Sequence, residues 1–169
     1  MMYDVGSSIL YGRMGVCKVE DVGSPPFQQD AERLYYKLRS LFSSSGEMIY
    51  IPVDAGASLR PLISSGEAVN YLRQLPQVAA GVCSAKRPNE VAAHYQELLA
   101  SCEPGAYLLL LKEIFLKQKE LSKRGKKLGQ VDLKYQKVAE RLACEEFAVA
   151  LDSTPDSVRE HLYSAMGAA

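Results

Sequence analysis

The residues whose types and spacing most clearly suggest a binding function form a cationic run, Lys123-Arg124-Gly125-Lys126-Lys127. Every residue of this run but the glycine is positively charged. Exposed lysine and arginine side chains bind phosphates, and each phosphate that they neutralise steepens the dependence of affinity on salt. The same residue types favour the C-terminal ends of helices, so a solvated helix end explains the run equally well. No aromatic residue interrupts it, so base stacking on single strands is not predicted.

The total charge of the chain hides this run. The sequence has 169 residues, with 20 basic and 20 acidic side chains and a formal net charge of +0. Residues 112–141 contain ten basic and four acidic residues, a net charge of +6, whereas residues 142–169 contain one and five, a net charge of −4. The neutral total offers no bulk attraction to nucleic acid, yet it conceals a candidate DNA-facing surface.

Patterns for catalysis are scarce. His94 and His161 each stand alone on a predicted helix, where a histidine is more often a surface or satisfied residue than a base or ligand. Glu145 and Glu146 are adjacent, so on a helix they point about 100° apart and cannot share a proton; we expect them to be solvated or beside a basic neighbour. No phosphate-binding loop, nucleophile elbow or zinc-protease motif occurs in the sequence. We therefore predict a non-enzymatic protein without cofactor or metal.

The cysteines and the apolar segments indicate the compartment. The four cysteines, Cys17, Cys83, Cys102 and Cys144, include no CxxC pair, which predicts buried or half-buried thiols rather than a zinc site or a disulfide framework. Residues 1–12 lack the pattern of a signal peptide. The most apolar run, residues 107–111, is far shorter than the roughly 20 residues of a membrane helix. We expect a cytoplasmic protein that does not contact membranes.

The elements that position these residues change in type along the chain. The first part holds short β-branched and aromatic runs separated by Gly, Pro and Ser, which predict strands at residues 8–11, 16–19, 34–38 and 48–51. Tight or short connections are expected at residues 12–15 and 43–46, and a longer turn at residues 23–30. Such strands favour a small twisted antiparallel barrel or sheet, whose edge strands are available for pairing.

The second part has helical periodicity. Ser64 and Glu67 form a predicted capping box for a helix that Pro76 ends. Pro88 or Asn89, Pro104, and Thr154-Pro155-Asp156 mark further helix starts, and glycines at 125 and 129 separate the third helix from the fourth. The predicted helices span approximately residues 64–75, 88–101, 104–121, 131–151 and 155–166. The order is all-β and then all-α, so we predict an α+β protein with a β domain at residues 1–62 and a helical domain of about five helices at residues 63–169.

Three ordered motifs then resemble the CarD family, which comprises CarD, CdnL and the RNA-polymerase-interacting module of the transcription-repair coupling factor. The opening, Tyr3 to Val22, places Val5-Gly6, Ile9-Leu10-Tyr11, Gly15 and Val19 as that family does. Met48-Ile49-Tyr50-Ile51-Pro52-Val53 resembles its late strand with an apolar-Pro-apolar ending. The third motif, Lys126-Lys127-Leu128-Gly129-Gln130-Val131-Asp132 followed by Tyr135, Ala139, Leu142 and residues 145–148, resembles the C-terminal helices of Gram-positive relatives.

This resemblance implies a Tudor-like, SH3-like β-barrel that docks on the β subunit of bacterial RNA polymerase, by edge-strand pairing. Ile49 and Ile51 have core packing as their alternative role, and Tyr50, which points the opposite way, is the better contact. The implied polymerase-binding residues are Tyr36, Leu38, Met48, Tyr50, Ile51, Pro52 and Val53. Family members often carry an arginine at the place of Tyr50.

The resemblance also implies a helical domain near promoter DNA. CarD proteins commonly place a tryptophan against the minor groove of promoter DNA, from the helix that begins here near Pro88. This chain has no tryptophan. Val91 stands at that position, ahead of the matching Tyr95. An aliphatic wedge is physically possible. The candidate DNA-binding residues are Lys86, Arg87, Val91, Lys123, Arg124, Lys126 and Lys127.

The primary hypothesis is a transcription regulator that binds RNA polymerase and promoter DNA. The alternative is an adaptor that docks on the polymerase without touching DNA, which suits the neutral total charge and the missing tryptophan. A third hypothesis, an enzyme, requires a deep pocket lined by paired ionisable groups.

Overall fold

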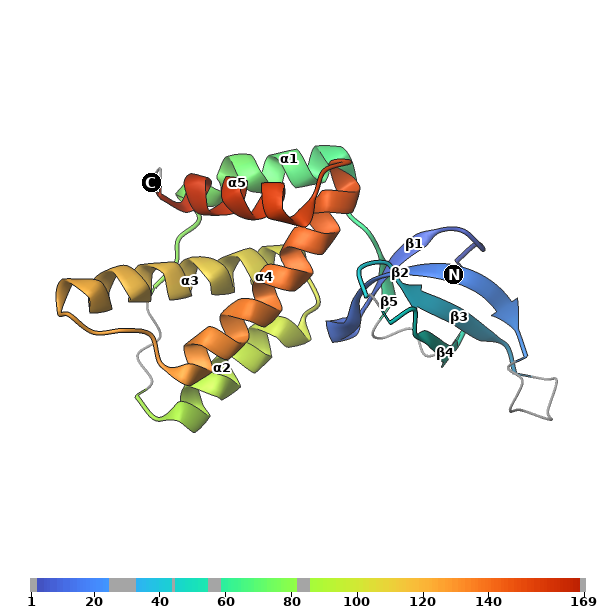
Figure 1. The fold of residues 1–169 in the computed structure, drawn as a ribbon, viewed down its shortest axis with the longest axis horizontal. Coiled ribbons are helices and arrows are strands. Elements are labelled where there is room, and N and C mark those ends of the chain that lie inside the picture. The colour runs from blue at the N-terminus through green and yellow to red at the C-terminus, as the bar shows by residue number, and fades with distance from the viewer. Residues whose placement is uncertain (1–2, 25–32, 44, 55–58, 82–85, 168–169) are drawn as a thin grey trace. The chain divides into compact units, whose positions relative to one another are not determined.

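A computed structural model describes residues 3–24, 33–43, 45–54, 59–81 and 86–167. The chain divides into two compact units, residues 1–62 and 63–169 (Figure 1). The long turn predicted at residues 23–30 falls almost wholly outside the described residues, as does Cys83. Within the described residues no helix is both long and apolar enough to cross a membrane, and no three His, Cys, Asp or Glu side chains gather as a metal site would require.

The N-terminal unit is a five-stranded antiparallel sheet with the order β4-β3-β2-β1-β5. The strands are β1 (Ser8–Tyr11), β2 (Gly15–Gly23), β3 (Tyr35–Ser40), β4 (Met48–Pro52) and β5 (Leu59–Pro61). A single 3-10 turn, Gly12–Met14, joins β1 to β2. Its first residue, Gly12, and the residue after it, Gly15, suit glycine because their φ angles are 43° and 93°. The strands predicted from the sequence are confirmed, and β5 is an additional one.

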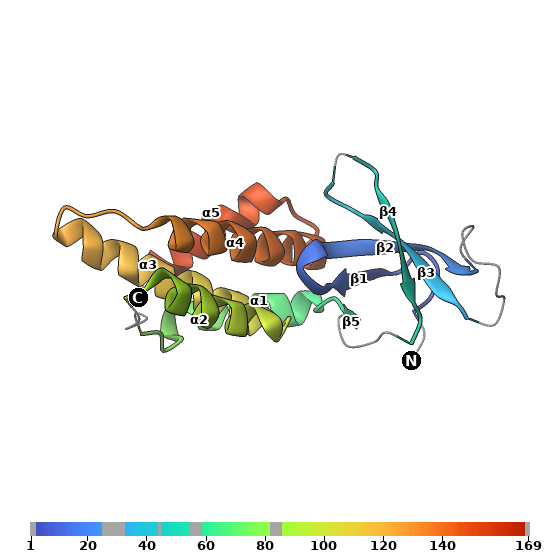
Figure 2. The same cartoon turned by 90° about the horizontal axis from the view of Figure 1, so that it is seen from below.

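One face of the sheet carries a small core, and Leu10 and Val16 on the other face are also buried. Seven residues form that core among the described ones: Ile9, Cys17, Val19, Tyr36, Leu38, Ile51 and Leu59. The register shifts between Val19 and Asp21, where β2 pairs with β3, and such an irregularity increases the local twist that Figure 2 shows in β3 and β4. The antiparallel sheet is confirmed, whereas closure into a Tudor-like barrel is not, because β4 and β5 do not pair in the part of the chain described.

The described residues of the C-terminal unit form five α-helices, as the sequence predicts. They are α1 (Ser65–Gln74), α2 (Pro88–Ala100), α3 (Pro104–Lys123), α4 (Gln130–Ala150) and α5 (Pro155–Gly167). The capping box is present: the Glu67 N–H donates to Ser64 Oγ at 3.1 Å and the Ser64 N–H donates to Glu67 Oε1 at 3.2 Å. Thr154 Oγ1 likewise accepts the Ser157 N–H at 3.2 Å at the start of α5. Local capping therefore places these helix starts.

Helix α4 is the centre of this unit, since it contacts each of the other four α-helices and runs obliquely across α2 and α3 (Figure 1). Its buried side chains include Tyr135, Leu142 and Phe147, and α5 supplies Val158, Leu162 and Met166. The helical core has twenty buried residues among those described. This larger core holds the turn between α3 and α4, where the cationic run lies.

Candidate functional site

The first candidate surface is the edge of the sheet formed by β4. In the described residues β4 pairs with β3 alone, in a register that sets Lys37 opposite Tyr50 and Arg39 opposite Met48. The Val53 N–H donates to the Leu34 carbonyl at 3.0 Å. By the alternation of antiparallel ladders, the main-chain groups of Met48, Tyr50 and Pro52 then point away from β3. A proline fits such a position because it has no N–H to give to the ladder.

The side chains of β4 divide between two faces, as the alternation predicts. Ile51 is buried and Ile49 packs against the sheet core. Tyr50 lies on the opposite face, where a shallow hollow of about 160 Å³ is lined by Asp21, Gly23, Ser24, Tyr35, Lys37 and Tyr50. Met48 is exposed to 39%. The available side chains of this edge are therefore Met48, Tyr50 and Pro52, whereas Val53 packs against the sheet core.

Three of the proposed polymerase contacts need correction. Tyr36, Leu38 and Ile51 belong to the sheet core, with at most 5% of each exposed. The Tyr36 hydroxyl oxygen accepts the Tyr3 N–H at 2.9 Å and so ties down the N-terminal segment. Because β3 lies between β2 and β4, its main-chain groups are committed to the sheet. These three residues support the surface but do not present side chains to a partner.

The structure also adds two residues to this region that the sequence interpretation missed. Leu41 and Phe42 follow β3 and are exposed to 39% and 40%. The sequence signal for their exposure was an apolar pair directly before the polar Ser43-Ser44-Ser45-Gly46 segment. A short connection between two strands has no interior in which such a pair could be buried. Exposed apolar side chains beside an open edge are features of binding surfaces.

The second candidate surface is the α3–α4 turn. Lys123, Arg124, Lys126 and Lys127 are all exposed there. The Lys126 N–H donates to the Leu121 carbonyl at 2.8 Å and the Gly125 N–H donates to the Ser122 carbonyl at 3.1 Å, which is a Schellman motif. Gly125 has a φ of 69°, so the position suits glycine. A defined hydrogen-bonded turn therefore presents the cationic run.

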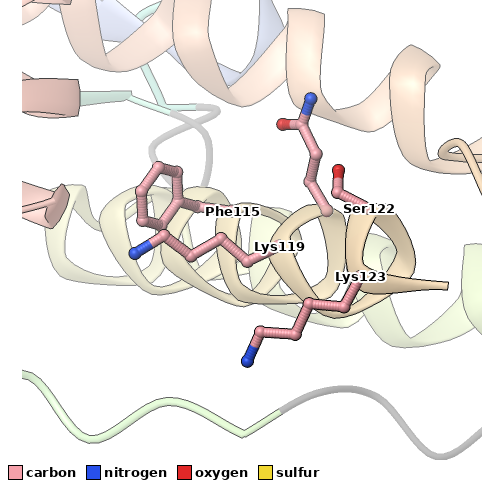
Figure 3. A pocket seen from close by; sticks show the side chains of 5 residues that line it. Phe115, Lys119, Ser122 and Lys123 are labelled. Atoms are coloured by element: carbon pink, nitrogen blue, oxygen red, sulfur yellow. The ribbon is translucent and has the colours of Figure 1, made fainter. Parts of the chain in front are cut away.

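The charge of this turn is only partly balanced within the chain. Arg124 lies 3.5 Å from Glu120 one turn earlier on α3, with both side chains more than half exposed. Such a pair contributes little to stability. A hollow of about 570 Å³ along α3 adds Lys119 beside Lys123, together with Phe115, Gln118 and Ser122 (Figure 3). The Lys119 ammonium lies 4.9 Å from the Phe115 ring centroid. The positive surface thus extends along the C-terminal half of α3.

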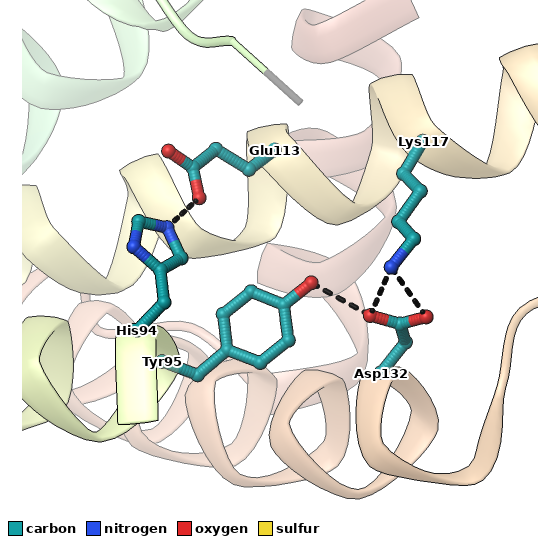
Figure 4. A network of polar contacts seen from close by, with 5 residues as sticks. All are labelled: His94, Tyr95, Glu113, Lys117 and Asp132. Atoms are coloured by element: carbon teal, nitrogen blue, oxygen red, sulfur yellow. Dashed lines mark hydrogen bonds and ion pairs between the residues drawn. The ribbon is translucent and has the colours of Figure 1, made fainter. Parts of the chain in front are cut away.

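Asp132 anchors the turn to the helical core (Figure 4). Its carboxylate accepts the Tyr95 hydroxyl at 2.7 Å, the Lys117 ammonium at 3.0 Å and the Gly129 N–H at 3.3 Å. Only 4% of Asp132 is exposed. One carboxylate therefore joins α2, α3 and the start of α4, and it holds the far end of the turn in place.

The DNA-binding residues predicted on α2 divide between surface and core. Lys86 and Arg87 are exposed, and the Arg87 carbonyl accepts the N–H groups of Glu90 and Val91 at the start of α2. Val91 is exposed to only 5% and belongs to the helical core. The wedge role suggested for Val91 is therefore wrong, because a wedge must project from the surface. Lys86 and Val91 do share a cavity with Lys117, Leu121 and residues 129–132.

The isolated acid and base groups serve structural roles. His94 Nε2 lies 2.7 Å from Glu113 Oε2, linking α2 to α3, so the prediction of a satisfied histidine is confirmed there. Glu145 is buried beside Arg141 at 3.5 Å, which confirms the basic neighbour. Glu146 is fully buried and accepts the Ile63 N–H at 3.1 Å. The solvated alternative for this pair is wrong, because helix α4 is central and both carboxylates lie within its packed faces.

The cysteine thiols and the Lys112 ammonium are the other side chains that could react. Burial raises the pKa of the Cys144 thiol to about 12, and the neighbouring Glu140 carboxylate adds to this rise. Cys17 is also buried and Cys102 is half-buried, as the sequence predicts. Lys112 is a buried cation that sequence reasoning missed: its ammonium donates to the carbonyls of Leu75, Pro76 and Val78 at 2.7, 3.0 and 2.7 Å. It closes the carbonyl end of α1 and has a structural role.

The chain thus has two parts, a β unit with an exposed strand edge and a helical unit that carries a cationic turn. Residues 3–63 match the family model of the CarD-like/TRCF RID domain. The N-terminal unit is therefore similar to the domains of this family, and RID domains are known to interact with the β subunit of RNA polymerase. No match was found among curated proteins. The resemblance noted in the sequence is thereby confirmed for the β unit.

Proposed function

We propose that this protein regulates transcription by docking its N-terminal unit on the β subunit of RNA polymerase in the cytoplasm and bringing its helical unit to promoter DNA. The observation that carries the proposal is the family match over residues 3–63, joined with the exposed edge of β4. The protein acts through binding energy alone. Contacts made only in the open promoter complex shift the balance from closed to open, whereas contacts made equally in both shift nothing.

The docking mode is strand addition to β4. Main-chain hydrogen bonds supply affinity in this mode, and alternate side chains supply specificity. Tyr50 is the central side chain, with Met48 and Pro52 on the same face and Val53 at the end of the strand. The exposed Leu41 and Phe42 extend the apolar part of the surface. A partner strand of the β subunit would continue the sheet on the outer side of β4.

A titration with bacterial RNA polymerase core enzyme tests this docking. Tyr50→Pro removes an outward-pointing N–H, while Tyr50→Thr removes the aromatic side chain and keeps that N–H. Strand addition predicts a loss of at least about tenfold in affinity for the proline variant and a smaller loss for the threonine variant, with circular dichroism unchanged in both. Absence of saturable binding by the natural chain at tens of micromolar would overturn the proposal, and equal losses would overturn the strand-addition mode.

The DNA contact is proposed for the cationic turn. Lys123, Arg124, Lys126 and Lys127 are exposed on one ordered turn, with Lys86 and Arg87 at the start of α2 as further candidates. Replacing both Lys126 and Lys127 by Gln should flatten the slope of log affinity against log salt by about 1.8, because each phosphate contact contributes about 0.9. The matched control replaces Lys134 and Lys137, exposed lysines of α4, by Gln and leaves the slope unchanged. Equal effects of the two pairs would contradict a localised contact.

The burial of Val91 favours a second candidate function. The protein would then be an adaptor that docks on the polymerase through β4 and does not touch DNA. The two functions separate in one measurement: an adaptor keeps the polymerase affinity and shows no steep salt dependence toward promoter DNA. In vitro transcription with and without the protein then shows whether docking alone changes initiation.

A further inference from the structure

The helical unit contains a cavity whose lining shares one residue, Lys86, with the surfaces proposed above for polymerase and DNA. Its volume is about 410 Å³, within the roughly 300–1,000 Å³ of small-molecule sites. Three helices and their ends contribute to it: Lys86, Pro88 and Val91 at the start of α2, Lys117 and Leu121 on α3, and residues 129–132 at the start of α4. The cavity therefore lies where distant parts of the sequence meet at one end of the bundle.

One side of the cavity is apolar. Pro88 and Val91 come from α2, Leu121 comes from α3 and Val131 comes from α4. Val91 belongs to the helical core and Val131 is packed against it, so these side chains form a fixed wall. A wall of this kind accepts a compact apolar or flat group, whose burial contributes the larger part of the binding energy at such sites.

The charged side of the cavity favours an anion. Lys86 is exposed, and Lys117 is held at 3.0 Å from Asp132. Asp132 supplies a carboxylate to this lining. That carboxylate already accepts hydrogen bonds from the Tyr95 hydroxyl, the Lys117 ammonium and the Gly129 N–H. Its charge is therefore balanced by Lys117, and Lys86 leaves the lining positive. The N-terminus of the 21-residue helix α4 and the nearby cationic turn add to the positive potential.

We propose that this cavity binds a nucleotide, with the base against the apolar wall and the phosphates toward Lys86 and the start of α4. The phosphates match the excess of positive charge, and the flat base matches the wall of Val91, Leu121 and Val131. Gln130, which also lines the cavity, offers both a donor and an acceptor to the edge of a base. Inorganic phosphate alone would leave the apolar wall uncovered, and a nucleoside alone would leave the cations unmatched. The site does not depend on docking to the polymerase or on the DNA contact proposed for the cationic turn.

Titration of the full chain with ADP, adenosine and pyrophosphate, followed by NMR, tests the site. ADP is expected to shift the methyl signals of Val91, Leu121 and Val131 and to bind more tightly than either of its halves. Lys86→Gln should weaken ADP binding about two- to fivefold, and Val131→Trp, which fills the cavity, should weaken it at least about tenfold. Lys137→Gln, an equal change of charge at an exposed site on α4 outside the cavity, is expected to change nothing.

Several results would overturn the site. They are the absence of saturable ADP binding up to about 10 mM, equal binding of pyrophosphate and ADP, and ADP shifts that persist in both cavity variants. A single-stranded oligonucleotide, dA8, distinguishes the source of the nucleotide. If dA8 displaces ADP and shifts the same methyl signals, the cavity takes nucleotides from a nucleic-acid strand; if dA8 leaves bound ADP in place, the ligand is a free nucleotide.

Discussion

The surfaces proposed for binding on the two units present opposite kinds of chemical group. The β unit offers a strand edge, where the recognition groups belong to the main chain and the side chains beside it are largely aromatic or apolar. The helical unit offers a turn, where the recognition groups are the ends of long charged side chains. In the proposed function, affinity at the edge would rest on hydrogen bonds and burial, whereas affinity at the turn would rest on charge. Salt should therefore affect the second surface far more than the first.

The supporting cores differ as well. Among the described residues, the core cluster of the sheet has seven buried residues and that of the helices has twenty. The helical unit also buries charged groups, among them Lys112, Asp132 and Glu146, whereas the sheet core contains none. A small apolar core is sensitive to lost methyl groups, and a core with buried charges is sensitive to lost partners. Substitutions in the two units should therefore destabilise them by different mechanisms.

The largest effect is expected at Asp132. Asp132→Ala removes the acceptor of Tyr95, Lys117 and Gly129 at once and leaves Lys117 without its ion-pair partner at a partly buried site. We expect the helical unit to lose about 3–4 kcal/mol of its free energy of unfolding, measured by urea denaturation. Asp132→Asn keeps one acceptor oxygen and should lose less. A loss of similar size at the exposed control Asp156→Ala in α5 would contradict the anchoring role.

The next effect tests the small core of the sheet. Leu38→Ala removes a fully buried side chain and should destabilise the β unit by about 3 kcal/mol. Its matched control is Leu34→Ala, just before β3. Leu34 is 43% exposed, so its replacement should change the free energy of unfolding by no more than about 0.5 kcal/mol. Hydrogen exchange followed residue by residue shows which unit opens. Equal loss of protection in α4 would show that the two units unfold together.

Much of this architecture could be predicted because its signals are local. The capping box at Ser64 and Glu67, the Thr154 cap and the prolines at the starts of α2 and α3 each act within one helical turn. The strand alternation around Ile49, Tyr50 and Ile51 likewise indicates which face is buried. Periodicity and capping are properties of neighbouring residues, so they can be interpreted without knowing the fold.

The rest depends on contacts between distant residues. Lys112 lies in an apolar stretch of α3, and its three carbonyl partners come from residues 75–78. Asp132 receives its donors from α2 and α3, and Glu146 accepts the N–H of Ile63. A charged side chain in a sequence gives no sign of such partners. For the same reason the burial of Val91 was missed, since the helices that cover it follow later in the chain.

A smaller effect is expected at the turn. Gly125 has a φ of 69°, a conformation that costs about 1–2 kcal/mol for a residue with a Cβ. Gly125→Ala should therefore destabilise the helical unit by that amount and loosen the cationic turn. Gly66→Ala is the control: this glycine lies in the first turn of α1, where an added Cβ meets only Ser64 Oγ at 3.9 Å, and alanine should not destabilise it. Equal melting temperatures for the two variants would show that the glycine at position 125 is not required for the stability of the helical unit.

The smallest effect concerns a buried carboxylate. Burial raises the pKa of Glu145, and the Arg141 guanidinium partly opposes that rise. The folded unit therefore holds this proton more tightly than the unfolded chain does, so the stabilisation is complete below the unfolded pKa, about 4.3, and is lost as the pH rises through the folded pKa. Glu145→Gln should raise stability at pH 7 by less than about 1 kcal/mol, with the gain vanishing near pH 4, whereas Glu160→Gln at an exposed site on α5 should show no such dependence. If the glutamine variant is less stable at pH 7, the ion pair with Arg141 outweighs the cost of burial.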